Sequence, residues 1–235
     1  MGSTPMTSVS VILPFCNQAD DVREIVTGHA AMLAQAGIGH EIILVPNGST
    51  DDTNAVCRAL AAEMPSVRCL EIEGRGWGCA VRSGIAAAAG ALICYTNSAR
   101  TQPDDLKQIL DHALRNPGFV VKATRVSRDA WIRRVGSFSY NSLCRTLLRL
   151  ATRDVNGTPK AFPRSASTLL DLQRDDDLID LEFMWRCARA SLPVTETPIH
   201  GGARRGGRST TGWKTAWRLY TGAVLFWAAA ESRGR

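Results

Sequence analysis

The chain of 235 residues is short of lysine, because only four of its 28 basic residues are lysine and the others are arginine. Arginine favours planar, bidentate contacts with phosphate and carboxylate groups. The net charge of +6 therefore suits nucleic acid, an anionic membrane surface or a phosphorylated substrate, without choosing between them. No aromatic platform or nucleic-acid recognition motif accompanies the charge, so we expect no nucleic-acid partner.

Paired-cysteine motifs are also missing. The seven cysteines form no CxxC pair and no zinc spacing, and their number is odd. Most fall inside expected strands or helices, where a cysteine behaves as a small buried apolar residue. These features exclude a disulfide framework or a zinc motif and indicate a reducing, cytoplasmic setting.

No apolar run reaches the roughly 18 residues that a membrane span needs. The nearest, Leu219 to Ala230, is too short to cross a bilayer but long enough to lie on its surface. Residues 1–7 carry neither a charged nor an apolar signal region, so we interpret them as a disordered start or a cloning remnant. We expect a cytoplasmic protein, with peripheral contact at the inner membrane face left open.

What the chain does have is a regular alternation of apolar runs and helical patterns. Strands are expected at residues 9–15, 41–45, 66–72, 91–95 and 119–123, and helices at 20–34, 53–62, 79–89 and 103–114. This alternation predicts an α/β domain whose mostly parallel central sheet has helices on both faces, as in Rossmann-like folds.

The second half is less regular. A basic amphipathic helix is expected at residues 132–150, a helix at 178–190, and short strands at 160–163 and 194–199. A Gly/Arg-rich segment, 201–212, precedes a last helix at 213–230 that combines three tryptophans with Lys214 and Arg218. We divide the chain into one domain, 8–211, and an amphipathic helix with tail, 212–235. This helix could pack on the domain, on a second copy or on a membrane.

The segment Gly90 to Leu106, GALICYTNSARTQPDDL, is the expected centre of the site. Its apolar strand ends at Thr96-Asn97-Ser98-Ala99, and Pro103 opens the next helix. In an open α/β sheet, ligands bind at the carboxyl ends of the strands. We therefore expect a ligand to lie beside Asn97.

Seven segments resemble, in order, the family 2 inverting glycosyltransferases of GT-A fold, and most closely the branch that includes dolichol-phosphate mannose synthase. The segment VSVILPFCNQ (9–18) resembles the opening motif VSVVIPAYNE, and EIILVPNGSTDDT (41–53) resembles EIIVVDDGSTDGT. The others are GRGWGCAVRSG (74–84), the DXD-like segment 90–106, DVNGTPKAFPR (154–164), Asp180 to Glu182, and Arg204 to Ser209.

Two departures from the family concern the donor site. Pro46 and Asn47 replace the two aspartates after the second strand, and Asn97-Ser98-Ala99 replaces the DXD triplet. A hard cation prefers carboxylate and phosphate oxygens. We therefore expect no metal ligand and no divalent metal cofactor, with Mg²⁺ or Mn²⁺ bound at most weakly and arginines supplying the positive charge.

The resemblance implies a transferase that moves a sugar, with inversion, from a nucleotide-linked donor to a small-molecule or lipid acceptor bearing a phosphate or hydroxyl. Asp180, Glu182 and Arg204 are the implied catalytic residues. The implied donor-binding residues are Pro14, Phe15, Asn17, Asn47, Ser49, Arg75, Arg82, Asn97, Ser98 and Ala99. Lys160, Arg205, Arg208 and Ser209 are the implied acceptor or phosphate contacts.

Other interpretations stay open for these residues. Asp180 and Glu182 stand two apart on a helix, so only one can point into the site. Arg75 and Arg82 also fit surface charges, and the arginines of 204–208 fit a solvated or lipid-binding loop. A second hypothesis is a catalytically silent homologue that acts as a binding or scaffolding subunit. Retention of Arg75, Lys160, Glu182 and the loop Arg204 to Ser209 speaks against it, because a silent site has no need of them.

Overall fold

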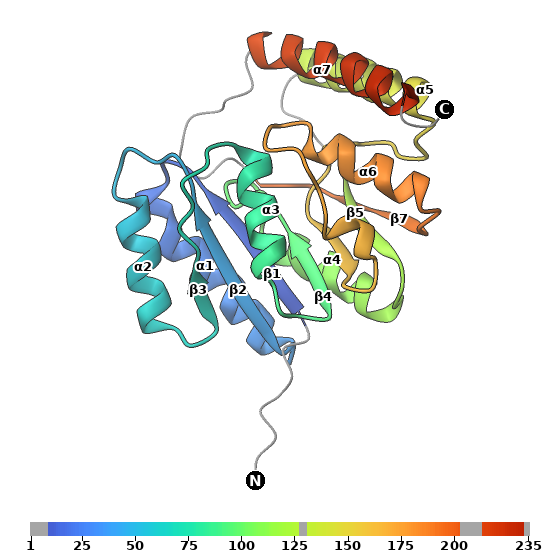
Figure 1. Ribbon diagram of the computed structural model, residues 1–235. Coiled ribbons are helices and arrows are strands. Elements are labelled where there is room, and N and C mark those ends of the chain that lie inside the picture. Colours follow the sequence, from blue (N-terminus) through green and yellow to red (C-terminus); the bar gives the residue numbers. More distant parts are fainter. Residues whose placement is uncertain (1–8, 127–130, 203–212, 233–235) are drawn as a thin grey trace.

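The computed structural model describes residues 9–126, 131–202 and 213–232. Its centre is one seven-stranded sheet of order β3-β2-β1-β4-β6-β5-β7 (Figure 1). The strands are β1 (Val9–Phe15), β2 (His40–Pro46), β3 (Val67–Cys69), β4 (Leu92–Tyr95), β5 (Val120–Arg125), β6 (Lys160–Pro163) and β7 (Val194–Ile199). β6 runs antiparallel to β4 and β5, and the other neighbours pair in parallel. The predicted mostly parallel α/β sheet is confirmed.

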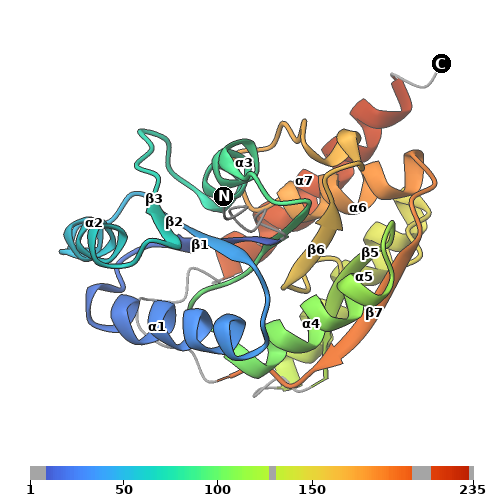
Figure 2. The same cartoon turned by 90° about the horizontal axis from the view of Figure 1, so that it is seen from below.

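Helices cover both faces of this sheet. They are α1 (Ala19–Gln35), α2 (Thr53–Glu63), α3 (Trp77–Ala87), α4 (Pro103–Arg115), α5 (Trp131–Leu148), α6 (Ile179–Arg189) and α7 (Trp213–Ser232), with a 3₁₀ turn, η1, at Ser167–Leu169. Apolar residues of α1, α2 and α4 pack on one face, and those of α3, α5, α6 and α7 pack on the other. Figure 2 shows α1 and α4 on one side of the sheet and α3 and α6 on the other.

The first strand explains why the sheet forms where the sequence predicts. All seven residues of β1 are buried, and the strand lies between β2 and β4. A strand covered on both faces needs an apolar side chain at nearly every position, rather than at alternate ones. VSVILPF meets this requirement, and Ser10 donates its hydroxyl to Glu41 at 2.6 Å.

One predicted strand is shorter than its apolar pattern indicates. The expected strand 66–72 keeps strand geometry only at Val67–Cys69. β3 lies at the edge of the sheet and pairs with three residues of β2 on one side only. An edge strand has no second neighbour to hold its ends in register, so pairing stops early.

The last helix packs on the domain, which is the first of the three arrangements that the sequence left open. α5 and α7 lie side by side above the sheet (Figure 1), and the rings of Tyr140 and Tyr220 meet edge to face at 5.6 Å. Phe226 packs in the same way on Trp185 of α6, at 5.4 Å. Within the described ranges, no helix combines the length and apolar character required to cross a membrane.

Candidate active site

The carboxyl ends of β2, β1 and β4 lie next to one another at one edge of the sheet, because these strands pair in parallel. Asn17, Asn47 and Asn97 each follow one of these ends. The segment Gly90 to Leu106, where the sequence predicts a site, thus lies at an edge formed by the ends of three strands. Ligands of open α/β sheets bind at such an edge.

Asn17 and Ser49 hold the loops after β1 and β2 together. The side-chain oxygen of Asn17 accepts a hydrogen bond from the backbone N–H of Thr50 at 2.7 Å. The backbone N–H of Asn17 donates to the hydroxyl of Ser49 at 3.2 Å. Asn17 has a positive φ of 52°, which asparagine tolerates better than most residues. Of the other predicted donor contacts, Pro14, Phe15 and Asn47 are buried, and Asn47 is 7% exposed.

In the turn after β4, some side chains are buried and others are partly accessible. Ser98 donates its hydroxyl to the carbonyl oxygen of Pro14 at 2.6 Å, and Ser98 and Ala99 are each 3% exposed. Asn97 and Arg100 are half-buried. Asn97 and Arg100 are therefore the partly accessible side chains of this turn, whereas Ser98 and Ala99 serve its packing.

The glycine-rich turn before α3 packs against another part of the chain. A Cβ on Gly78 would come within 2.6 Å of backbone atoms of Arg174, Asp175 and Asp176. Gly76 has a φ of +113°, and a Cβ there would meet the carbonyl oxygen of Asp175 at 2.7 Å. The backbone N–H of Cys79 also donates to that oxygen, at 3.0 Å. These glycines therefore permit close packing of the loop 173–177 on the start of α3.

The two predicted arginines of this segment differ in what they contact. Arg82 donates to Asp175 at 2.5 Å and to the carbonyl oxygen of Gln173 at 3.1 Å, so it fastens the same loop to α3. Arg75 is exposed, and its Cγ would lie 3.3 Å from a Cβ on Gly48. Arg75 thus lies over the loop after β2, and its guanidinium makes no ion pair with any residue that the structure describes.

Asp180, a predicted catalytic residue, is bound from three sides. Its carboxylate accepts the hydroxyl of Tyr95 at 2.9 Å and the indole N–H of Trp77 at 3.0 Å. It also forms a short ion pair with the ammonium of Lys160. Lys160 is fully buried, and burial lowers its pKa. The sequence predicted separate roles for these residues, with Lys160 binding the acceptor and Asp180 acting in catalysis. In the structure they form one ion pair.

Glu182, the other predicted carboxylate, points toward the loop 173–177. It accepts the backbone N–H of Gln173 at 2.9 Å, that of Arg174 at 2.8 Å and the guanidinium of Arg186 at 2.8 Å. The side chain is 4% exposed. Asp180 and Glu182 therefore face different partners, as their spacing on a helix implies.

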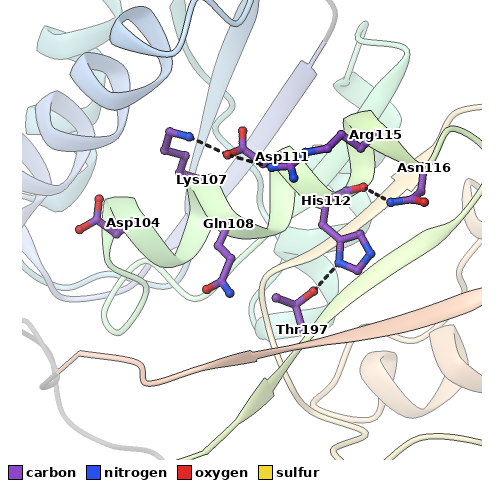
Figure 3. A pocket seen from close by; sticks show the side chains of 8 residues that line it. All are labelled: Asp104, Lys107, Gln108, Asp111, His112, Arg115, Asn116 and Thr197. Atoms are coloured by element: carbon purple, nitrogen blue, oxygen red, sulfur yellow. Dashed lines mark hydrogen bonds and ion pairs between the residues drawn. The ribbon is translucent and has the colours of Figure 1, made fainter.

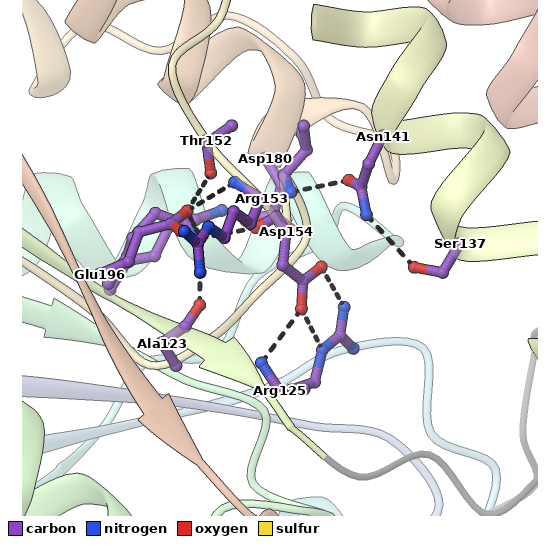
Figure 4. A network of polar contacts seen from close by, with 12 residues as sticks. Ala123, Arg125, Ser137, Asn141, Thr152, Arg153, Asp154, Asp180 and Glu196 are labelled. Carbon is purple, nitrogen blue, oxygen red and sulfur yellow. Dashed lines mark hydrogen bonds and ion pairs between the residues drawn. The ribbon is translucent and has the colours of Figure 1, made fainter. Parts of the chain in front are cut away.

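A second buried lysine, which sequence reasoning did not single out, lies opposite Lys160. Lys122 on β5 pairs in register with Lys160 on β6, and its ammonium binds the backbone oxygen of Asp154 at 2.6 Å and the carboxylate of Glu196 at 3.2 Å. Figure 4 shows this polar network, in which the Asp154 carboxylate also takes two bonds of 2.8 Å from Arg125. The signal in the sequence was a lone lysine inside the apolar run FVVKA.

This lysine gives a pH-dependent prediction. Burial and the neighbouring Lys160 lower the pKa of Lys122 to about 8, while Glu196 and Asp154 raise it in part. The unfolded chain therefore holds the proton more tightly, and the contribution of Lys122 to stability falls as the pH drops through this value. Between pH 9.5 and 7.5, the free energy of unfolding should fall by about 2 kcal/mol more in the wild type than in Lys122→Met. Urea unfolding at both pH values measures this, and parallel pH profiles would contradict it.

Two hollows in the described surface lie beside α4, away from the strand ends. One has a volume of about 580 Å³ and lies between α4 and Thr197 of β7. Figure 3 shows its polar lining, with a hydrogen bond of 2.7 Å between His112 and Thr197. None of the predicted site residues lines this hollow, and its other polar contacts include ion pairs along α4, such as Lys107 with Asp111 at 2.6 Å.

The Gly/Arg segment starts beside the turn after β4. The backbone N–H of Gly202 donates to the carbonyl oxygen of Arg100 at 2.9 Å, and the side chain of Gln102 packs directly on Gly202. Arg204, Arg205, Arg208 and Ser209 themselves lie outside the described residues, as do residues 1–7. Their predicted roles stay predictions.

The donor set at the β4 turn does not suit a hard cation. Asn97 offers an amide oxygen, the Ser98 hydroxyl is bonded to Pro14, and Ala99 has no ligand atom. Across the described ranges, no three His, Cys, Asp or Glu side chains gather closely enough to hold a metal. Ca²⁺ and Mg²⁺ sites are built from carboxylate and carbonyl oxygens, which these residues do not assemble.

Comparison with known proteins shows several relatives. The undecaprenyl-phosphate 4-deoxy-4-formamido-L-arabinose transferase of Sodalis glossinidius is 26% identical over 69% of this chain, which spans 51% of that relative's length. The dolichyl-phosphate beta-glucosyltransferase of Drosophila melanogaster is 26% identical over 95% of this chain and 74% of its own length.

A similar solved structure corrects one prediction. The fold matches glucosyl-3-phosphoglycerate synthase from Mycobacterium tuberculosis with a TM-score of 0.71, at 18% identity, over 94% of this chain and 80% of that one. That synthase is seen with Mn²⁺ and UDP, and other structures of it also contain Mn²⁺. The expectation that no divalent metal takes part is therefore wrong, because it rested on the missing carboxylates alone.

The family itself is shown by a match over most of the chain. Residues 10–168 match glycosyl transferase family 2. This range contains β1, β2, β4 and the turns that follow them, and the GT-A fold of the solved neighbour agrees with it. The resemblance predicted from the ordered motifs is confirmed, and the chain belongs to glycosyl transferase family 2.

Proposed function

We propose that this protein transfers a sugar from a nucleoside diphosphate sugar to a phosphate-bearing acceptor, with inversion at the sugar. The observation that carries this is Arg75, an exposed arginine over the loop after β2 in a family 2 domain. Its guanidinium has no carboxylate partner among the described residues and can bind a diphosphate, whereas Arg82 is engaged by Asp175. Bidentate arginine–phosphate contacts are strong and charge-assisted.

The acceptor follows from the chemistry that the relatives share. Two relatives act on undecaprenyl and dolichyl phosphates, and the structural neighbour binds phosphoglyceric acid. A phosphate oxygen that attacks the sugar is already anionic and needs no general base, whereas transfer to the hydroxyl of phosphoglyceric acid would need one. The first case fits a site in which both Asp180 and Glu182 are buried in hydrogen bonds.

A lipid-linked acceptor would be met at a membrane, and the α5–α7 pair is the surface suited to that. Phe138, Trp217 and Leu225 are 71%, 68% and 70% exposed. Aromatic and apolar side chains of this kind suit the membrane interface. The alternative is that α7 contacts a second copy of the chain. Sedimentation with lipid vesicles measures membrane binding, and light scattering measures the oligomeric state.

Transfer is tested with UDP-, GDP-, CDP-, ADP- and TDP-sugars, each offered 3-phosphoglycerate or a polyprenyl phosphate. Mn²⁺ belongs in each assay, because it accompanies UDP in the structural neighbour. Product formation supports the proposal, and the anomeric configuration of the product by NMR tests inversion. Neither transfer nor donor hydrolysis with any pair would leave the silent scaffold as the better hypothesis.

The scaffold hypothesis has gained one argument from the structure. Lys160 and Glu182, whose presence spoke for an active site, also have structural partners in Asp180 and in the loop 173–177. Their retention is therefore explained without catalysis. Arg75, which has no such partner among the described residues, is the residue on which the two hypotheses differ.

Replacing Arg75 with alanine should raise the KM for the donor roughly 10- to 100-fold, because a hydrogen bond to a charged group contributes about 1.5–3 kcal/mol. Arg58→Ala is the matched control, since Arg58 is a surface arginine of α2 paired with Glu71 at 2.8 Å. Steady-state kinetics with varied donor measure the effect. An unchanged KM in Arg75→Ala would show that the diphosphate binds elsewhere.

A further inference from the structure

The turn after β4 exposes an arginine at the point where three strand ends meet. Of residues 97–100, Ser98 and Ala99 are buried, and Asn97 and Arg100 are half-buried. The side chains of this turn that remain partly accessible to a ligand are therefore one amide and one guanidinium.

The charge of Arg100 has no carboxylate partner among the residues that the structure describes. Arg68, Arg82 and Arg125 each pair with a carboxylate, at 2.8, 2.5 and 2.8 Å. Arg100 forms no ion pair within the described part of the chain, although it lies at the well-packed end of a central strand. A half-buried cation without a partner is costly unless a ligand supplies the opposite charge.

The backbone of Arg100 is nevertheless held firmly. Its N–H donates to the carbonyl oxygen of Asn97 at 3.1 Å, and its own carbonyl oxygen accepts the N–H of Gly202 at 2.9 Å. The hydroxyls of Thr96 and Thr101 bond across the same turn at 2.5 Å. A turn that is already fixed loses little backbone entropy when a ligand binds.

Arg75 and Arg100 lie on either side of the strand ends of β2, β1 and β4. Arg75 lies on Gly48, just after β2, and Arg100 follows β4, with β1 between the two strands. The backbones of β2 and β4 are two strand spacings apart, about 10 Å. Long arginine side chains on the loops after these strands can therefore approach one extended, doubly charged ligand.

We propose that Arg100 binds the diphosphate of the sugar donor, beside Asn97 and across the edge from Arg75. This rests on the proposed function and assigns a donor contact that neither the ordered motifs nor the relatives indicate. The planar guanidinium can take two phosphate oxygens, which a lysine at the same place cannot do.

The test is calorimetric titration with the five nucleoside diphosphates and their parent nucleosides, in buffer with Mn²⁺. Arg100→Ala should bind the preferred nucleoside diphosphate roughly 10- to 100-fold more weakly than the wild type. Its affinity for the nucleoside should not change. Arg100→Lys should fall between the two, because it keeps the charge but loses the bidentate contact.

Arg115→Ala is the control, since it removes the same charge from α4 at a side chain that is 76% exposed. Equal affinity of Arg100→Ala and the wild type for the diphosphate overturns the inference while the proposed function stands. An equal loss for nucleoside and diphosphate also overturns it, because it indicates a distorted turn. If the wild type binds no nucleoside diphosphate, the proposed function fails as well.

Discussion

Replacing Asp180 with asparagine is expected to lower the free energy of unfolding by about 3 to 5 kcal/mol, because it leaves the buried ammonium of Lys160 without its counter-charge. Lys160 is fully buried, and Asp180 is 4% exposed. The asparagine amide would still form part of the hydrogen bonds to Tyr95 and Trp77. The loss of stability therefore reports mainly the missing negative charge. Urea unfolding at pH 7 measures the difference.

A double-mutant cycle separates the pair from the role of either residue. Lys160→Met alone should destabilise by a similar amount, and the double variant Lys160→Met/Asp180→Asn should lose clearly less than the sum of the two. Additive losses would show that the ion pair contributes little. A stable Asp180→Asn protein without transfer activity would instead support the predicted catalytic role of Asp180.

Replacing Gly78 with alanine is expected to destabilise the protein by about 3 kcal/mol and to weaken donor binding. The added methyl would lie within 2.6 Å of three backbone atoms of the loop 173–177. Backbone atoms cannot rotate aside as a side chain can, so the loop must shift from the start of α3. That shift also disturbs Arg75 and Trp77, which precede Gly78 in the chain.

Gly28→Ala is the matched control for this substitution. Gly28 lies within α1, and a Cβ there would meet Pro103 at an ordinary contact distance of 3.6 Å. It should leave stability unchanged or raise it slightly, since alanine favours helix over glycine. Equal stability of the two variants would show that the loop is not packed on the glycine-rich turn.

The interior of this domain carries an unusual share of charge. Lys122 and Lys160 face each other on neighbouring strands, and Asp154, Asp180 and Glu196 surround them. Buried ion pairs add little to stability overall, but breaking one leaves an expensive uncompensated charge. We infer that these residues hold β5, β6 and α6 in one arrangement behind the site, whereas Arg75 and Arg100 contact the donor.

The order of strands and helices could be predicted from the sequence because its signals are local. VSVILPF is apolar at nearly every position and is buried throughout in β1, and Pro103 stands at the start of α4 as predicted. The edge strand β3 was the exception, since its length depends on a neighbour rather than on its own residues. The family was likewise predictable, because ordered motifs survive where individual residues change.

The sequence by itself therefore determined the α/β fold, the family and the strand ends where a ligand should bind. Only the tertiary structure decided which charged residues there are free. Arg75 and Arg82 look alike in the sequence, but a partner 93 residues away occupies Arg82. Trp77 and Asp180 meet across 103 residues. Local patterns fix backbone conformation, whereas the pairing of charges depends on contacts that exist only once the chain has folded.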